Sequence, residues 1–236
     1  MANDADKDIT NESSIDHWKM SWVENSIPFH LLEVHPSLGR HVDKLTKGRD
    51  NLTIFFPLCG KAVDMRWLAE KGHKVIGVEI SDVAIKTFFK EANLEFTESD
   101  IKDGEGKLFM SKDENIKLFQ CDMFKYKREF GGMVDAIWDR GALEAIDVDQ
   151  REFYLKLMLS ILKLDGVYLL HCFEFPDGAF ETGPHEIKQN EIVEMFGPKC
   201  SVDKLEDYML SQAQLEFHGI DQDTKIQGNV YRIVQK

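Results

Sequence analysis

The chain has 236 residues with 43% hydrophobic and 30% charged side chains, which is typical of one globular domain with a full core. Its formal net charge of −13 argues against nucleic-acid and anionic-membrane partners, because both require a basic surface. The acidic N-terminus lacks the apolar region of a signal peptide, and no apolar run is long enough to span a membrane. We therefore expect a cytoplasmic protein that is a monomer. The cysteines lack the paired spacing of a metal site, so no metal is expected; they are Cys59, Cys121, Cys172 and Cys200.

The N-terminal region divides into a polar tail and a helical segment. Residues 1–13 offer no apolar residue to bury, and we predict that they are disordered. Residues 14–236 form one predicted domain, in which 14–48 is an N-terminal helical lid. Trp18 and Trp22 are four residues apart and share one helix face, and Phe29 follows them. These aromatic residues either attach the helix to the core or close over a ligand.

The stretch from 52 to 81 predicts the first βαβ unit of a parallel sheet. An apolar strand at 52–56 is broken by Pro-Leu-Cys-Gly, and a helix follows at 62–71. Gly72 ends this helix, and a second buried strand at 75–78 leads into Glu79.

The position of Glu79 predicts a ribose site. It lies nineteen residues after Gly60 (79 − 60), at the end of the second strand, where a carboxylate can accept hydrogen bonds from both ribose hydroxyls. The Gly60 turn lets the ligand approach the backbone. The G-x-G-x-x-G fingerprint of dinucleotide binding is missing, which favours a nucleoside-type cofactor such as S-adenosylmethionine. The alternative is a surface glutamate that caps a strand.

Two further strand ends carry polar residues. Residues 82–93 form a predicted helix, residues 95–115 a loop or small hairpin, and residues 116–121 the third strand, closed by Asp122. Asp122 either faces the adenine edge of the nucleoside or simply caps its strand. The fourth strand, 133–138, leads into Asp139 and Arg140, where ligands of doubly wound sheets bind. We expect Arg140 to face this cleft; the alternative is a structural Asp139–Arg140 pair.

The last third of the chain completes the sheet. We predict a helix from 149 or 150 to 164 with an apolar stripe, a fifth strand at 166–175, a helix at 186–196 and an antiparallel pair at 202–210 and 229–234. The stripe consists of Phe153, Leu157, Ile161 and Leu164, and the possible substrate contacts after the fifth strand are Phe175, Phe180 and Glu181. His171 and Cys172 point to opposite faces of their strand, so we expect core residues and no nucleophile–base pair.

These elements together predict an α/β fold of the Rossmann-like class I methyltransferase type. The sheet is mostly parallel and seven-stranded, with a C-terminal antiparallel pair and helices on both faces. Methyl transfer needs a positioned nucleophile and exclusion of water, so no catalytic triad is expected. Amino methyltransferases that act on nucleic acid carry an Asn/Asp-Pro-Pro-aromatic element after the fourth strand. This chain has W-D-R-G at 138–141 instead. A small acceptor fits this sequence better.

Four motifs carry a family resemblance. They are W-x-x-x-W-x(6)-F-H at Trp18–His30, F-F-P-L-C-G-K at Phe55–Lys61, I-G-V-E-I-S at Ile76–Ser81 and I-W-D-R-G-A-L at Ile137–Leu143. In this order they resemble the thiopurine S-methyltransferase family, and the similarity extends from about residue 14 to the C-terminus.

The resemblance implies a cytosolic enzyme that transfers a methyl group from S-adenosylmethionine to a small aromatic or heterocyclic thiol, leaving S-adenosylhomocysteine. It implies that Trp18, Trp22 and Phe29 cover the cofactor and that Phe29 also faces the substrate. Leu58, Glu79, Asp122 and Met123 are the cofactor contacts that it implies. Arg140 lies beside cofactor and substrate and is the expected catalytic residue.

The departures from the family concern the acceptor. The loop at 176–185 has Gly-Pro-His in place of a Gly-Pro-Pro-aromatic run, and Gln214 stands where the family has a second substrate-side arginine. Two alternatives therefore stay open: a methyltransferase for halide, sulfide or another small nucleophile, and a non-enzymatic protein that binds S-adenosylmethionine.

Overall fold

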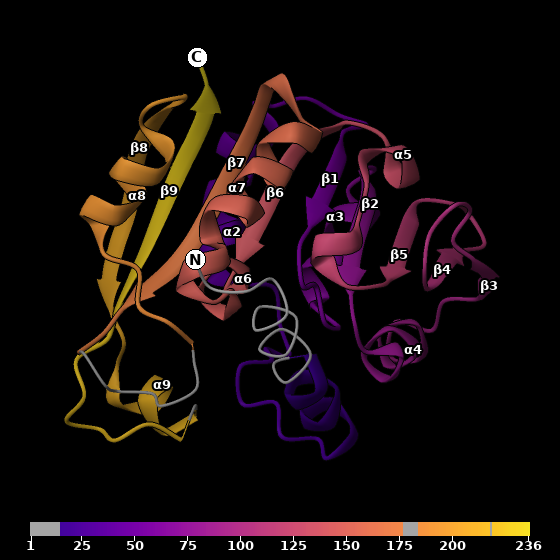
Figure 1. Ribbon diagram of the computed structural model, residues 1–236. Helices are drawn as coiled ribbons and strands as arrows, with labels where there is room; N and C mark the ends of the chain where they lie inside the picture. Colours follow the sequence, from indigo (N-terminus) through magenta and orange to yellow (C-terminus); the bar gives the residue numbers. More distant parts are fainter. Residues whose placement is uncertain (1–14, 177–183, 218) are drawn as a thin grey trace, which may run out of the picture.

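The computed structural model describes residues 15–176, 184–217 and 219–236. The disorder predicted for residues 1–13 and the contacts predicted for Phe180 and Glu181 lie outside these residues. In the described chain a single mixed sheet carries helices on both faces (Figure 1). This arrangement confirms the predicted α/β class.

The sheet has nine strands in the order β3-β4-β5-β2-β1-β6-β7-β9-β8. The pairs within β5-β2-β1-β6-β7 are parallel, and β9 and β8 complete that end as antiparallel strands. Their bounds are β1 Thr53–Phe56, β2 Lys74–Glu79, β3 Phe96–Asp100, β4 Lys107–Ser111, β5 Ile116–Gln120, β6 Val134–Arg140, β7 Leu162–Glu174, β8 Cys200–Met209 and β9 Gln227–Gln235.

The predicted count of seven strands is wrong, because the segment after the second helix pairs into the sheet. Strands β3 and β4 form an antiparallel hairpin, which confirms the hairpin alternative for residues 95–115, and this hairpin extends the sheet beyond β5. All five residues of β3 are exposed, since it is an edge strand. Four of its five side chains are charged or carry a hydroxyl, so the strand gives no apolar alternation that sequence patterns could detect.

The helices form two layers that cover opposite faces of the sheet (Figure 1). One layer comprises α2 Pro36–Thr46, α3 Val63–Glu70 and α4 Asp82–Glu91. The other comprises α5 Arg128–Gly131, α6 Ala142–Ala145, α7 Arg151–Ile161 and α8 Gln189–Phe196. The short elements η1 Met123–Lys125, η2 Val148–Gln150 and α9 Gln212–Phe217 lie in connections, and residues 15–23 are helical. None of the described helices is both long and apolar enough to cross a bilayer.

Alternation along the central strands divides the core between the two faces. Ile54 and Phe56 of β1 pack in the cluster with α2, α3 and α4, whereas Phe55 packs in the cluster with α7 and α8. Because neighbouring residues of a strand point to opposite faces, a strand buried on both sides must be apolar throughout. This explains the continuous apolar runs of the sequence.

Helix α7 is shorter than predicted, and its buried face matches the predicted stripe only in part. It ends at Ile161, and Leu162 already begins β7, although no glycine or proline separates the two elements. Phe153 is 56% exposed and Leu164 is 75% exposed, so neither belongs to the core. The predicted Ile161 is buried and Leu157 packs against the core. The other buried residues of α7 are Arg151, Tyr154, Leu155 and Met158.

Candidate functional site

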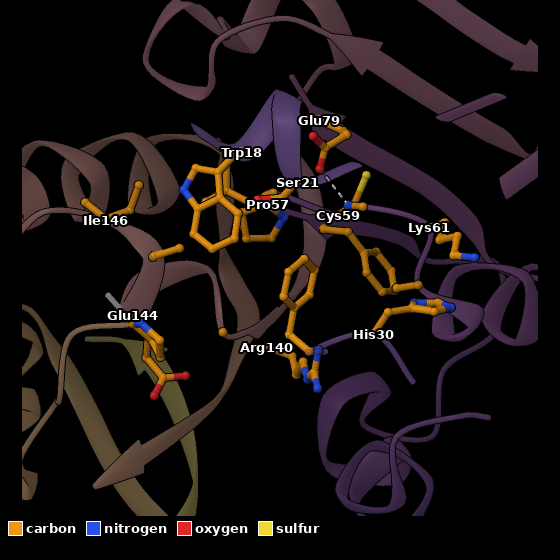
Figure 2. A pocket seen from close by; sticks show the side chains of 18 of the residues that line it. Trp18, Ser21, His30, Pro57, Cys59, Lys61, Glu79, Arg140, Glu144 and Ile146 are labelled. Carbon is orange, nitrogen blue, oxygen red and sulfur yellow. Dashed lines mark hydrogen bonds between the residues drawn. The ribbon is translucent and has the colours of Figure 1, made fainter. Parts of the chain in front are cut away.

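A pocket of about 480 Å³ lies at the carboxyl ends of β1, β2 and β6 (Figure 2). This is the edge where ligands bind in doubly wound sheets. All nine residues predicted to contact the cofactor line this one pocket: Trp18, Trp22, Phe29, Leu58, Gly60, Glu79, Asp122, Met123 and Arg140. Segments far apart in the sequence thus meet at the predicted place, although their roles toward a ligand stay predictions.

Glu79 ends β2 with its carboxylate fixed by the backbone. Its Oε2 accepts a hydrogen bond from Gly60 N–H at 2.8 Å, and its Oε1 accepts one from Ser81 N–H at 2.8 Å. Burial raises the pKa of Glu79, while these backbone donors oppose the rise. Each oxygen keeps capacity for a second donor, which is the requirement for holding a diol. Glu79 is therefore a buried residue of the site and not a surface cap.

The turn at Gly60 requires glycine for two reasons. Its φ is +50°, a conformation that residues with a side chain rarely adopt. A Cβ atom at this position would also lie 2.7 Å from Cζ2 of Trp22, which packs directly on the turn. The N-terminal helical segment is thus tied to the loop after β1.

The N-terminal segment forms one wall of the pocket. Trp18 and Trp22 each contact the ring of Phe29 edge to face, with centroid separations of 5.7 and 5.9 Å. All three rings line the pocket; Trp22 is buried, and Trp18 and Phe29 are half-buried. The two interpretations of these aromatic residues are therefore compatible, since Trp22 packs on the Gly60 turn and also lines the cavity.

The end of β5 contributes an acidic residue and a methionine. The Oδ1 atom of Asp122 accepts a hydrogen bond from Phe124 N–H at 2.9 Å and caps η1. Met123 is buried beside it in the pocket wall. Asp122 therefore caps η1, directly after β5, and also lines the pocket.

Asp139 and Arg140 do not pair with each other. The carboxylate of Asp139 is fully buried and accepts hydrogen bonds from the hydroxyls of Tyr154 and Tyr168 and from two backbone N–H groups of α6. Arg140 points instead toward the pocket, and it has neither a hydrogen bond nor a salt bridge with any described residue. Burial lowers the pKa of Arg140, and the carboxyls of Asp64 and Glu144 oppose this change. The cleft-facing position of Arg140 is as predicted.

The aromatic residue predicted after the fifth strand, Phe175, is buried and lines the same pocket. The two polar residues inside that strand are separated, as expected: His171 Nε2 lies 2.9 Å from Tyr208 Oη, whereas Cys172 packs in the core on the opposite face. They form no nucleophile–base pair.

Sequence reasoning missed Glu144, an acidic residue of the pocket wall. It lies in α6, is only 2% exposed, and accepts a hydrogen bond from Phe173 N–H through Oε1 at 2.7 Å. Burial raises the pKa of Glu144 to about 8. No spacing in the sequence distinguishes it from a surface glutamate, because its burial depends on β7 and on the segment that follows.

Comparison with known proteins shows which family this chain resembles in sequence. The sequence profile described as Thiopurine S-methyltransferase (TPMT) matches residues 13–236. The chain is 42% identical to a probable thiopurine S-methyltransferase of Danio rerio over 81% of this chain and 83% of the relative. It is 40% identical to the thiopurine S-methyltransferase of Lycaon pictus over 88% and 85%, respectively.

Solved structures show the same fold at low sequence identity. The Burkholderia thailandensis 1,6-didemethyltoxoflavin-N1-methyltransferase, solved with 1,6-didemethyltoxoflavin and S-adenosylhomocysteine, is 14% identical with a TM-score of 0.62 over 94% of this chain and 87% of that one. The DhpI–SAH complex is 12% identical with a TM-score of 0.61 over 96% and 98%. The fold, the pocket and above all the sequence match lead to one conclusion: this chain belongs to the thiopurine S-methyltransferase family.

Proposed function

We propose that this protein transfers a methyl group from S-adenosylmethionine to the sulfur of a small aromatic or heterocyclic thiol. The observation that carries the proposal is the joint position of Glu79 and Arg140. They lie on opposite sides of one pocket, and each has hydrogen-bonding capacity directed into it (Figure 2). The family membership agrees with this assignment.

The residues of the pocket suit the methyl donor. Glu79 would hold the ribose hydroxyls, Leu58 and Met123 would pack against the nucleoside, and Trp18 would cover it. When bound, S-adenosylmethionine supplies an activated methyl group on a positively charged sulfur. The aromatic wall and the carboxylates favour such a cation. A volume of about 480 Å³ is in the range of small-molecule sites.

Arg140 is proposed to bind the acceptor sulfur as it becomes a thiolate. A guanidinium that has no hydrogen-bond or salt-bridge partner among the described residues stabilises an anion, which lowers the pKa of a thiol placed beside it. Phe29 and Phe175 provide apolar walls for a ring. A pocket with such walls favours an organic acceptor over halide or sulfide. No covalent intermediate on the enzyme is required, because the acceptor sulfur itself is the nucleophile.

The compartment, the class of acceptor and the oligomeric state are also proposals. We place it in the cytoplasm, because its four cysteines are all free and buried. The acidic net charge of −13 supports a small acceptor over nucleic acid. We also propose that the protein is a monomer, because every residue assigned to the donor and the acceptor belongs to this one chain.

A panel of acceptors tests the proposal. The protein is incubated with S-adenosylmethionine and with thiophenol, pyridine-2-thione, iodide or sulfide, and the methylated product is quantified. Methylation of the organic thiols above iodide and sulfide is expected. Arg140→Ala should reduce kcat/KM for thiols more than it weakens the binding of S-adenosylhomocysteine. Turnover of iodide or sulfide alone, or no turnover despite tight binding of S-adenosylhomocysteine, would reject the proposed acceptor.

A further inference from the structure

Glu144 is a buried acid in the acceptor half of the pocket that the proposed reaction has not used. It lies across the pocket from Glu79, on the same side as Arg140 (Figure 2). Its backbone is held by a hydrogen bond from His185 N–H to its carbonyl oxygen at 2.8 Å. An acid that is 2% exposed is rare in proteins unless it is paired or functional.

The carboxyl group of Glu144 is oriented but only half satisfied. Phe173 N–H donates to Oε1 at 2.7 Å, which fixes the plane of the group. Oε2 has no hydrogen-bond partner among residues 15–176, 184–217 and 219–236. The side chain is therefore held in one orientation with an open acceptor position on an atom of the pocket wall.

Several charged and titratable groups face Glu144 from three elements. They are Asp139 and Arg140 at the end of β6, Arg151 of α7 and Cys172 of β7. Arg140 and Glu144 influence each other through their charges, yet they form no salt bridge. A hydrogen-bond donor and a hydrogen-bond acceptor thus line the same pocket without pairing with each other, and both can bind a ligand.

The chemical complement of this pair is a cyclic thioamide, in which a C=S sulfur and a ring N–H lie on the same edge of the molecule. A simple aryl thiol offers the sulfur alone. We propose that Glu144 selects heterocyclic thiones as acceptors, by accepting a hydrogen bond from the ring N–H through Oε2 and taking its proton during methyl transfer. This inference rests on the proposed S-methyltransferase function and adds a second acceptor residue to Arg140.

The step balances in atoms and charge. The thione sulfur forms the new S–C bond to the methyl group, and the bond between that methyl and the sulfonium sulfur breaks with its electron pair left on the donor sulfur. The ring C=S becomes C–S as the ring C–N bond becomes C=N, and the N–H proton moves to Glu144 Oε2. The positive charge of the donor and the negative charge of the carboxylate disappear together, so no charge is stranded in the buried site.

Glu144→Gln is the informative variant, because it keeps the shape of the side chain. The amide oxygen must accept from Phe173 N–H, as Oε1 does now, so the amide NH₂ takes the place of Oε2. The NH₂ group of the glutamine would then point a donor at the ring N–H of the acceptor, and it cannot take a proton from it. Glu152→Gln is the matched control, because Glu152 is exposed on α7 and pairs with Lys156.

The test compares pyridine-2-thione, which has the ring N–H, with thiophenol, which lacks it. In Glu144→Gln we expect kcat/KM to fall roughly 100-fold for the thione, the scale of acid–base catalysis, and to change less than about threefold for thiophenol. Wild-type kcat/KM for the thione should rise with pH as Glu144 ionises, and this rise should be absent from the variant. Calorimetric titration of the thione into the protein saturated with S-adenosylhomocysteine should show roughly tenfold weaker binding in the variant.

The remaining outcomes decide against the inference. An equal loss for both acceptors would make Glu144 a structural residue, and unchanged kinetics for both would show that it does not touch the acceptor. In either case an active wild-type enzyme leaves the proposed function intact. A wild-type protein that binds S-adenosylhomocysteine but methylates neither acceptor overturns the proposed function and the inference together.

Discussion

The buried carboxyl group of Glu144 predicts a specific dependence of stability on pH. Burial raises its pKa from the ordinary 4.5 to about 8 in the folded protein. Below pH 4.5 the group is protonated in both the folded and the unfolded state, so its full contribution to stability is present. Between pH 4.5 and 8 the unfolded chain gains from ionisation while the folded protein does not, and stability falls as pH rises.

The magnitude follows from the difference between the two pKa values. One unit corresponds to about 1.4 kcal/mol, so the group lowers the free energy of unfolding by roughly 3 kcal/mol at pH 7. Glu144→Gln removes the titration and keeps the hydrogen bond from Phe173 N–H. The variant should therefore gain roughly 2–3 kcal/mol relative to wild type when the pH is raised from 5.5 to 7.5.

Urea unfolding of both proteins at pH 5.5 and 7.5 measures this gain directly. Every other titrating group contributes equally to both proteins and cancels from the comparison, except where it couples to Glu144. Glu152→Gln serves as the exposed control and should show no such gain, because solvent screens its pair with Lys156. A stability difference between wild type and Glu144→Gln that is the same at both pH values would refute the reasoning, because it would mean that Glu144 ionises alike in the folded and unfolded states.

Two further substitutions test how the site is built. Asp139→Ala should destabilise the protein by at least about 3 kcal/mol in urea unfolding, because it leaves two buried tyrosine hydroxyls and two backbone N–H groups without their acceptor. A loss below about 1 kcal/mol would show that these groups find other partners. Gly60→Ala should raise the calorimetric Kd for S-adenosylhomocysteine at least roughly tenfold. The new Cβ would displace Trp22, and alanine would be strained at the positive φ of this turn. Unchanged affinity would show that the packing of Trp22 on this turn is not needed for the donor.

The donor side of the site could be predicted from the sequence because its signals are local. Gly60 and Glu79 belong to one βαβ unit, in which spacing and strand order fix their relative position. Arg140 was predictable for a similar reason, since its place at the end of β6 puts it at the switch point of the sheet. The aromatic spacing of Trp18 and Trp22 required only helical periodicity.

The parts that were missed depend on contacts between distant segments. Strand β3 is mostly polar and fully exposed, so its sequence does not distinguish a loop from a hairpin, and only its pairing with β4 makes it a strand. The stripe assigned to α7 was wrong at Phe153, which lies on the surface. Its ring centroid is 5.5 Å from that of Phe124. The burial of Glu144 could not be predicted from the sequence, because it depends on the packing of β7 and the residues after it against α6.

The central claim is that Glu79 holds the ribose of the methyl donor, and calorimetric titration with S-adenosylhomocysteine tests it most directly. Wild type should bind with a Kd on the order of micromolar, and Glu79→Ala should bind roughly 100-fold more weakly or not detectably, because the acceptor for the two ribose hydroxyls is gone. Circular dichroism of the variant verifies that it is folded. Equal affinity in a folded Glu79→Ala protein, or no binding to wild type, would contradict the account.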